Sequence, residues 1–300
     1  MMKNQTNKQL SARFRYIRWW VILPLAFILF TQKDWWPYIE DWRCGCIAAK
    51  LRSQYSLVVR FGDPSEFYLQ PLPPVTDSPG RNISIEPVQP HSALTALQGI
   101  RRALSKYPED LILKYLEAIF IGGSLRHHGT KIGGTYFHSW IFLSAIPDFE
   151  DRGVALYEKC VHHELSSLLA DGAPFPYNQW CAVNEPDFEY RSSDAMDMAR
   201  SAAPESCLRA ENAPFWHMAG FVNEYGMSDV ENDINTYAEL AMSQPGTLKQ
   251  LTDQYPRIKA KTKILVDFYR GLAPELGRYF ETAGLIESQG NGPYLHRPRK

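Results

Sequence analysis

Apolar residues recur at helical spacing in two segments ahead of residue 175. In residues 91–108 the leucines and isoleucine fall three or four positions apart, with Ser92 as a possible N-cap and Pro108 after the last turn. In residues 148–172 an apolar stripe of the same period predicts a helix of four to five turns. Both segments therefore have one face that must be buried against another element.

Further helices are expected in the last quarter of the chain. A helical pattern begins near Val230, directly after two residues that favour N-caps, Ser228 and Asp229. The pattern is then interrupted near Pro256 and Pro274, since proline lacks the amide hydrogen that a helix interior needs. The sequence thus predicts several consecutive helices here rather than one long one.

Two apolar stretches between the first two helical segments indicate strands. They are the second half of residues 111–125, "LILKYLEAIFIGGSL", and residues 135–145, "TYFHSWIFLSA". The glycine-rich and basic residues between them are typical of a loop, so the two stretches predict a β-hairpin with a long turn. A short apolar stretch at residues 55–61, "YSLVVRF", is a further candidate strand.

The order of these segments predicts an α+β fold, with a small β-sheet followed by a mostly helical C-terminal half. We divide the chain into a basic segment and signal anchor at residues 1–31 and an extended, proline-rich linker at residues 32–90. A compact domain is expected over residues 91–285, and the tail, residues 286–300, is expected to be disordered.

The N-terminal segment has the pattern of a membrane anchor. Several Lys and Arg residues precede the apolar run "WWVILPLAFILF", residues 19–30, which no small-residue cleavage site follows. The next residues include a Trp pair and Tyr38, as at a membrane–water interface. The alternative is an amphipathic or buried helix. An uncleaved single-helix anchor implies that the rest of the chain lies outside the cytoplasm, which in a bacterium is the periplasm.

The composition is that of a globular protein and does not indicate a particular activity. The 300 residues are 45% hydrophobic and 22% charged, as in ordinary globular proteins, and the net charge of −1 gives no indication of a nucleic-acid partner. The five cysteines fit scattered thiols or one structural disulfide. The basic helix faces "RRALSK" and "RIKAKTK" are most often simply solvated.

Candidate chemistry is concentrated in "CVHHELSSLL", residues 160–169. A zinc peptidase has His-Glu-x-x-His on such a helix, with two metal ligands one turn apart and the Glu as general base. Here His163 and Glu164 match the first two positions, but Ser167 stands at the second histidine. A Ser-His-Asp triad is not indicated, because a serine within the same helix is not presented as a nucleophile.

Together with its surroundings this segment resembles the zinc-binding metallopeptidases of the gluzincin type, a zincin-like family. The strand "GGTYFHSWIFLS", then "VHHELSSLL", then "GFVNEYGM" with "ENDINTYAE", follow one another in the order of that family's edge strand, active-site helix and third-ligand segment. The resemblance covers roughly residues 92–270. It implies a zincin-like domain that hydrolyses a peptide or protein substrate with metal-activated water, and a Zn²⁺ cofactor.

The resemblance also implies roles for individual residues. His163 corresponds to the first zinc ligand and Glu164 to the general base. The third ligand falls at Glu231 or Asp233, and Tyr225 stands where a residue can stabilise an oxyanion. The sequence departs from the family twice. Ser167 replaces the second ligand, and an ungapped match puts Asn232 at the family's glutamate, while Glu239 corresponds at most to a carboxylate that supports a ligand.

Other residues could stand in for the missing histidine. His162 lies about 100° away around the helix, and Cys160 precedes His163 by three residues, a spacing acceptable for zinc. Distant histidines could also fold over the site, although each is more often a surface or hydrogen-bonded residue: His127, His128, His138 and His217.

Three functions therefore remain open. The first is a membrane-anchored zinc metallopeptidase, with Glu164 and Tyr225 as catalytic residues and His163, Glu231 and Asp233 as candidate metal ligands. The second is a catalytically inactive pseudo-peptidase of the cell envelope that binds a peptide or partner. The third is a structural protein in which the His-Glu pair is a coincidence.

Overall fold

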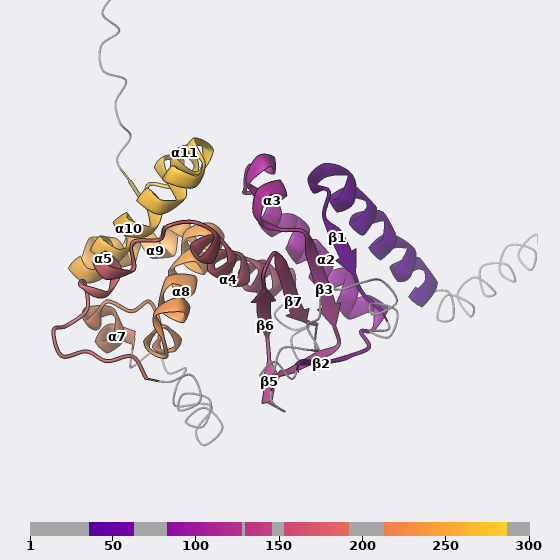
Figure 1. Cartoon of the computed structure of the whole chain (residues 1–300), viewed down its shortest axis with the longest axis horizontal. Coiled ribbons are helices and arrows are strands. Elements are labelled where there is room, and N and C mark those ends of the chain that lie inside the picture. Colours follow the sequence, from indigo (N-terminus) through magenta and orange to yellow (C-terminus); the bar gives the residue numbers. More distant parts are fainter. Residues whose placement is uncertain (1–35, 63–82, 128–129, 146–152, 192–212, 287–300) are drawn as a thin grey trace, which may run out of the picture.

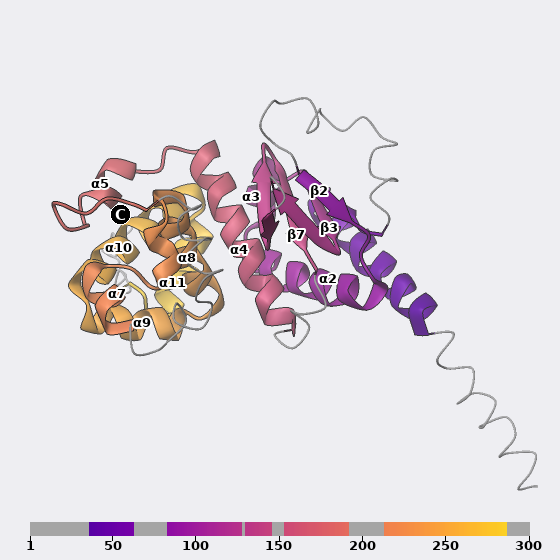
Figure 2. The same cartoon turned by 90° about the horizontal axis from the view of Figure 1, so that it is seen from below.

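The computed structural model describes residues 36–62, 83–127, 130–145, 153–191 and 213–286. The N-terminal part consists of a helix over residues 36–55, two small sheets and the helices α2 (Pro90–Leu104) and α3 (Glu109–Tyr115). The long helix α4 (Gly153–Gly172) follows, and Figures 1 and 2 show it between the sheets and the C-terminal helices. The predicted class, helices with small sheets, agrees with this arrangement.

One sheet has four strands in the order β1-β3-β7-β6, and its first three strands are parallel. These strands are β1 (Val58–Arg60), β3 (Ala118–Gly122), β7 (Trp140–Ser144) and β6 (Gly134–Phe137). The second sheet is antiparallel and contains β2 (Ile83–Glu86), β4 (Ser124–His127) and β5 (Thr130–Ile132). Strand β6 is therefore the terminal strand of the larger sheet among the strands that the structure describes.

Alternate side chains of β3 and β7 serve two separate cores, as the two-residue period of a strand requires. Ile119 and Ile141 belong to the main core with α2, α4 and α8 (Val230–Ser243). Phe120 and Phe142, on the other face, stack with ring centroids 4.9 Å apart and contact Leu125 of β4 in a smaller core. Both faces of the sheet are thus covered.

The prediction of one hairpin between residues 111–125 and 135–145 is wrong. Strand β3 pairs with β7 in parallel, and the hairpin lies inside "GTYFHSWIFLS", where β6 pairs with β7 in antiparallel orientation. His138 makes the tight turn with a φ of 54°, a left-handed conformation that sequence patterns rarely assign to histidine. Without a glycine to mark it, this turn reads as the middle of a strand.

The predicted linker, residues 32–90, begins with ordered elements. The helix over residues 36–55 places Cys44, Leu51 and Tyr55 in the main core, and β1 pairs with β3. Residues 36–62 are therefore a helix and a strand with side chains in the main core, not an extended linker. Most of the proline-rich segment, residues 63–82, lies outside the described residues.

The prediction of a membrane-anchored, extracytoplasmic protein is corrected. Among the helices that the structure describes, none combines the length and the apolar character that crossing a bilayer requires. The apolar run on which the prediction depended, residues 19–30, lies outside the described residues, as does most of the predicted tail, 286–300. Of the cysteines, Cys44, Cys46, Cys160 and Cys181 are free thiols, and Cys207 lies outside the described part.

The C-terminal helices begin where capping residues and prolines predict. Asp229 caps α8 by accepting a hydrogen bond from the backbone N–H of Asn232 at 2.7 Å. Proline occupies the first turn of α9 (Pro245–Gln254), α10 (Pro256–Leu272) and α11 (Pro274–Thr282), where its missing N–H costs nothing. By contrast, α2 is capped at Gln89 rather than Ser92, because Pro90 already begins that helix.

Close packing of α2 on α4 provides a test of the fold. A Cβ at Gly99 of α2 would lie 2.5 Å from Tyr157 Cβ and 2.9 Å from the Glu158 backbone nitrogen. Gly99→Ala should therefore push the two helices apart and lower the free energy of unfolding by about 1–3 kcal/mol.

The matched control is Gly45→Ala in the helix over residues 36–55, where a Cβ has no neighbour within 4 Å. That change should stabilise the protein by up to about 1 kcal/mol through helix propensity. Urea denaturation of both variants measures the difference, and a Gly99→Ala protein as stable as Gly45→Ala would contradict the close approach.

Candidate functional site

Helix α4, which lies between the sheet and the C-terminal helices (Figure 2), carries His163, Glu164 and Ser167. Positions 163 and 167 are one turn apart and therefore share the face that packs against α8. The apolar stripe of α4, which includes Val161, Leu165 and Leu168, is buried in the main core. Burial of this stripe fixes the rotation of the helix and hence the direction of its polar side chains.

His163 forms a close pair with Glu239 of α8. Its Nδ1 lies 2.6 Å from Glu239 Oε1, and both side chains are largely buried, with 13% and 22% of their surface exposed. Burial alone would lower the pKa of His163, but the hydrogen bond and charge of Glu239, with Glu164 and Glu231, raise it to about 9. The imidazole is therefore positively charged at neutral pH.

Tyr225 lies beside this histidine. It belongs to a short 3₁₀ helix, η4 (Glu224–Met227), and its ring stacks on His163 with centroids 5.9 Å apart and an interplanar angle of 25°. Asn223 holds η4 in place by accepting a hydrogen bond from Gly226 N at 3.0 Å. The structure thus brings Tyr225 and His163 together.

Glu164 lies beneath strand β6. A Cβ built at Gly134 would be only 2.6 Å from Glu164 Oε1, so the carboxyl group packs directly against the strand's backbone. Burial raises the pKa of Glu164 to about 7; the positive charge of His163 opposes the increase, whereas Glu231 and Glu239 add to it. The strand can approach α4 this closely because residue 134 is glycine.

Ser167, at the place of the second histidine, is joined to α8 by two hydrogen bonds. Its Oγ donates to Glu231 Oε1 at 2.6 Å and accepts from Asn235 Nδ2 at 2.6 Å. Ser167 and Asn235 are both almost completely buried. The hydroxyl group therefore uses its single donor and one of its two acceptor positions to connect the two helices.

Asp233, the other candidate ligand, points elsewhere. Two residues along a helix correspond to a rotation of about 200°, so Glu231 and Asp233 cannot face α4 together. Asp233 is fully buried and pairs with Lys261 Nζ of α10 at 2.6 Å. Its Oδ2 also accepts from Trp180 Nε1 and from Tyr190 OH, each at 2.8 Å. Asp233 thus connects α8 to α10 and to α5 (Tyr177–Cys181).

The residues considered as replacements for the missing histidine are engaged in other contacts. His162 is fully buried, its Nδ1 lies 2.9 Å from Tyr107 OH, and burial lowers its pKa. His138 forms the β6–β7 turn, and His217 Nε2 lies 3.3 Å from the carbonyl oxygen of Val222. The side chains of His127 and His128 lie outside the described part.

Cys160 precedes His163 by three residues on α4 and lies within the electrostatic influence of Glu239 and Glu164. Burial, with the nearby charges of Glu239 and Glu164, raises the pKa of this thiol to about 12. A metal ligand must be the thiolate, which this environment disfavours.

These side chains do not fit a catalytic zinc site. Such a site needs about three protein ligands and an open position. Within the residues that the structure describes, no group of three or more His, Cys, Asp and Glu side chains is arranged to hold a metal ion. Of the predicted set, His163 faces Glu239 of α8, Tyr225 stacks on His163, and Glu231 contacts Ser167 on the same side of α8, whereas Asp233 is held by Lys261.

Sequence reasoning did not find Asn235 and assigned Glu239 only a supporting role. Glu231, Asn235 and Glu239 are four residues apart, and His163 and Ser167 are also four apart. Two helices that each carry polar residues at this spacing can pair along one face. The four-residue spacing is visible in the sequence, but it does not by itself indicate which two helices meet.

Comparisons with known proteins give limited further information. No protein-family model matches the sequence, and no curated protein matches it. Among solved structures, the chain is similar to a candidate zinc-binding metallopeptidase from Bacteroides caccae, with a TM-score of 0.45 and 14% identical residues. The alignment covers 83% of this chain and 95% of that one.

The His163–Glu239 pair should make stability depend on pH above neutrality. A pKa raised from 6.5 to about 9 means that the contribution is complete below pH 6.5 and is lost as the pH rises through 9. Burial raises the pKa of Glu164 from 4.5 to about 7, so its effect is a fall in stability as the pH rises from about 4.5 to 7, below this window. The free energy of unfolding should therefore fall between pH 7 and pH 9.5, by at most about 3 kcal/mol.

In Glu239→Gln this decrease should become much smaller, because the negative partner of the imidazolium is lost. The exposed Glu109→Gln is the control and should keep the wild-type slope. Urea denaturation at several pH values measures both, and an unchanged slope in Glu239→Gln would show that the pair does not hold the proton.

Proposed function

We propose that this protein is a metallopeptidase-like domain without a zinc site, and that it binds an extended peptide instead of hydrolysing one. The observation that carries the proposal is the pair of hydrogen bonds from Ser167 to Glu231 and Asn235. They connect α4 to α8 at the position where a peptidase of this type would use a second histidine and a metal ion. Protein hydrogen bonds thus take over the structural role of the metal.

The chemistry around Glu164 agrees with loss of hydrolysis. A general base must act on a proton within hydrogen-bond reach, and it works best when the attacking water is activated. Glu164 instead packs against the backbone of β6, and no donor set in the described residues fits a metal that could activate water. We therefore assign Glu164 and Tyr225 to the shape and charge of a binding surface.

Strand β6 is the element best suited to receive a peptide. Ser144 N donates to Gly133 O at 2.9 Å, so residues 133 and 144 form a hydrogen-bonded pair. Hydrogen-bonded and non-hydrogen-bonded pairs alternate along an antiparallel ladder. Thr135 is therefore in a hydrogen-bonded pair, with its N–H and C=O directed towards β7, whereas the N–H and C=O of Gly134 point away from β7. An extended peptide can add to such a terminal strand through main-chain hydrogen bonds.

An active zinc peptidase is the second candidate, and one observation favours it. Metal-binding histidines usually donate their second ring N–H to a carboxylate, and His163 has that relation to Glu239. The experiment below separates the two candidates because they differ in metal content before any activity is measured.

Restoring the missing histidine tests the proposal. The wild-type protein should contain no stoichiometric zinc after dialysis against zinc and then buffer. Ser167→His would place a second imidazole one turn from His163 and next to Glu231, and should bind about one zinc ion per chain. The control His163→Asn/Ser167→His has similar bulk but lacks the first imidazole, and should bind none.

Elemental analysis gives the metal content, and circular dichroism shows whether each variant is folded. Stoichiometric zinc in the wild-type protein would overturn the metal-free proposal and favour the active peptidase. Failure of a folded Ser167→His variant to bind zinc would contradict the placement of these three residues around one site.

Peptide binding at β6 has a separate test. Fluorescence polarisation against synthetic eight-residue peptides with alternating apolar and polar residues should detect binding to the wild-type protein. Gly134→Pro removes the backbone N–H that points away from β7, whereas Gly134→Ala adds a Cβ in the same place and keeps that N–H. Gly134→Pro should bind about tenfold more weakly than Gly134→Ala. Equal binding by the two variants would contradict strand addition at this edge.

A further inference from the structure

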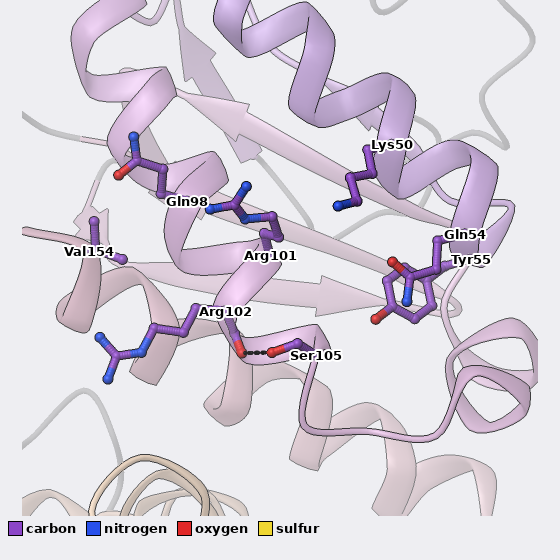
Figure 3. A pocket seen from close by; sticks show the side chains of 8 residues that line it. All are labelled: Lys50, Gln54, Tyr55, Gln98, Arg101, Arg102, Ser105 and Val154. Atoms are coloured by element: carbon purple, nitrogen blue, oxygen red, sulfur yellow. Dashed lines mark hydrogen bonds between the residues drawn. The ribbon is translucent and has the colours of Figure 1, made fainter.

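A basic pocket lies between the helix over residues 36–55, helix α2 and the start of α4 (Figure 3). Its volume is about 450 Å³, which suits a small molecule. The residues that line it are Lys50, Gln54, Tyr55, Gln98, Arg101, Arg102, Ser105 and Val154. None of them belongs to the candidate site around His163, so the pocket is independent of the proposed function.

The charges of the lining residues are all positive. Lys50, Arg101 and Arg102 contribute three cations, and no carboxylate lines the pocket. Arg102 is already paired with Glu158 of α4, with Nε 2.8 Å from Oε2. Figure 3 shows Lys50 and Arg101 extending from two different helices into the space between them.

Neither Lys50 nor Arg101 has an acidic partner among the residues that the structure describes. Cations in the last turn of a helix normally offset its partial negative charge, and Arg101 belongs to that turn of α2. Lys50 comes from a second helix, and its convergence with Arg101 raises the local positive potential. An anion placed between them would be attracted by both.

The remaining lining residues favour a ligand with hydroxyl groups. Gln54 and Gln98 each offer an amide that both donates and accepts. Ser105 Oγ donates to Arg102 O at 2.8 Å and Tyr55 OH donates to Leu104 O at 3.3 Å, so both oxygens retain acceptor positions. Val154 is the one aliphatic side chain in the lining.

We propose that this pocket binds a small phosphorylated and hydroxyl-rich molecule, of the size of a sugar phosphate, with its phosphate between Lys50 and Arg101. The guanidinium group of Arg101 can hold two phosphate oxygens at once, and Lys50 adds a point charge. The amides of Gln54 and Gln98 bind the hydroxyl groups. Arg102 remains with Glu158 and contributes its charge to the field of the pocket.

Isothermal titration calorimetry of the full chain at low ionic strength tests this site, with three probes: ribose 5-phosphate, inorganic phosphate and ribose. Ribose 5-phosphate should bind one molecule per chain, inorganic phosphate at least threefold more weakly, and ribose without detectable heat. If inorganic phosphate binds as tightly as ribose 5-phosphate, the role of the amides is wrong. If neither phosphate compound binds, the site is overturned.

Lys50→Gln and Arg101→Gln should each weaken the binding of ribose 5-phosphate at least tenfold. The control is Arg43→Gln, which removes one exposed charge from the helix that carries Lys50 but lies outside the pocket. Circular dichroism verifies that each variant is folded. Equal weakening by Arg43→Gln would show attraction to overall charge rather than to this pocket, and would also overturn the proposal.

Discussion

Helix α4 carries buried polar side chains whose partners fix the positions of the elements around it. A polar group that is removed from water without a hydrogen-bond partner costs several kcal/mol, and an unpaired charge costs more. Helix α4 lies between the sheet and the C-terminal helices. It buries five polar or charged side chains: Glu158, His162, Glu164, Ser166 and Ser167. Most of their partners come from other elements, so the positions of those elements are fixed through α4.

This constraint gives α4 two sides of opposite electrostatic character. On one side, Arg102 and Lys106 pair with Glu158. Burial alone would raise the pKa of Glu158, but these two cations and the hydrogen bond with His162 lower it to about 2. On the other side, Glu239 of α8 pairs with a positively charged His163, and the charge of Glu231 also favours the protonated imidazole. Helix α4 thus carries a carboxylate that pairs with cations of α2 and the residues after it, and a histidine that pairs with a carboxylate of α8.

What the sequence could predict was local. Spacing within one helix placed His163 and Ser167 on a common face, Asp229 was a recognisable cap, and prolines marked the starts of α10 and α11. These features depend on residues a few positions apart. The same reasoning failed for Asp233, because nothing in its own helix shows that Lys261 of α10 is buried opposite it.

The basic pocket also escaped sequence reasoning, for the same physical reason. Lys50 and Arg101 come from two different helices, and the pattern of either helix alone is that of an ordinary solvated face. Pairing across the fold depends on the sum of many contacts, which no short pattern contains. Only the strand–helix order, and hence the class of fold, could be read from the chain as a whole.

The parallel pairing of β1 with β3 has a consequence for how the chain acquires its structure. Residues 58–60 must find residues 118–120, about 60 positions later, and β7 joins only after residue 140. Closing so long a loop costs entropy before any contact repays it. During synthesis, the helix over residues 36–55 therefore leaves the ribosome well before the rest of the main core exists. Its core side chains, which include Leu51 and Tyr55, therefore stay exposed to water until the later segments of the core have been made.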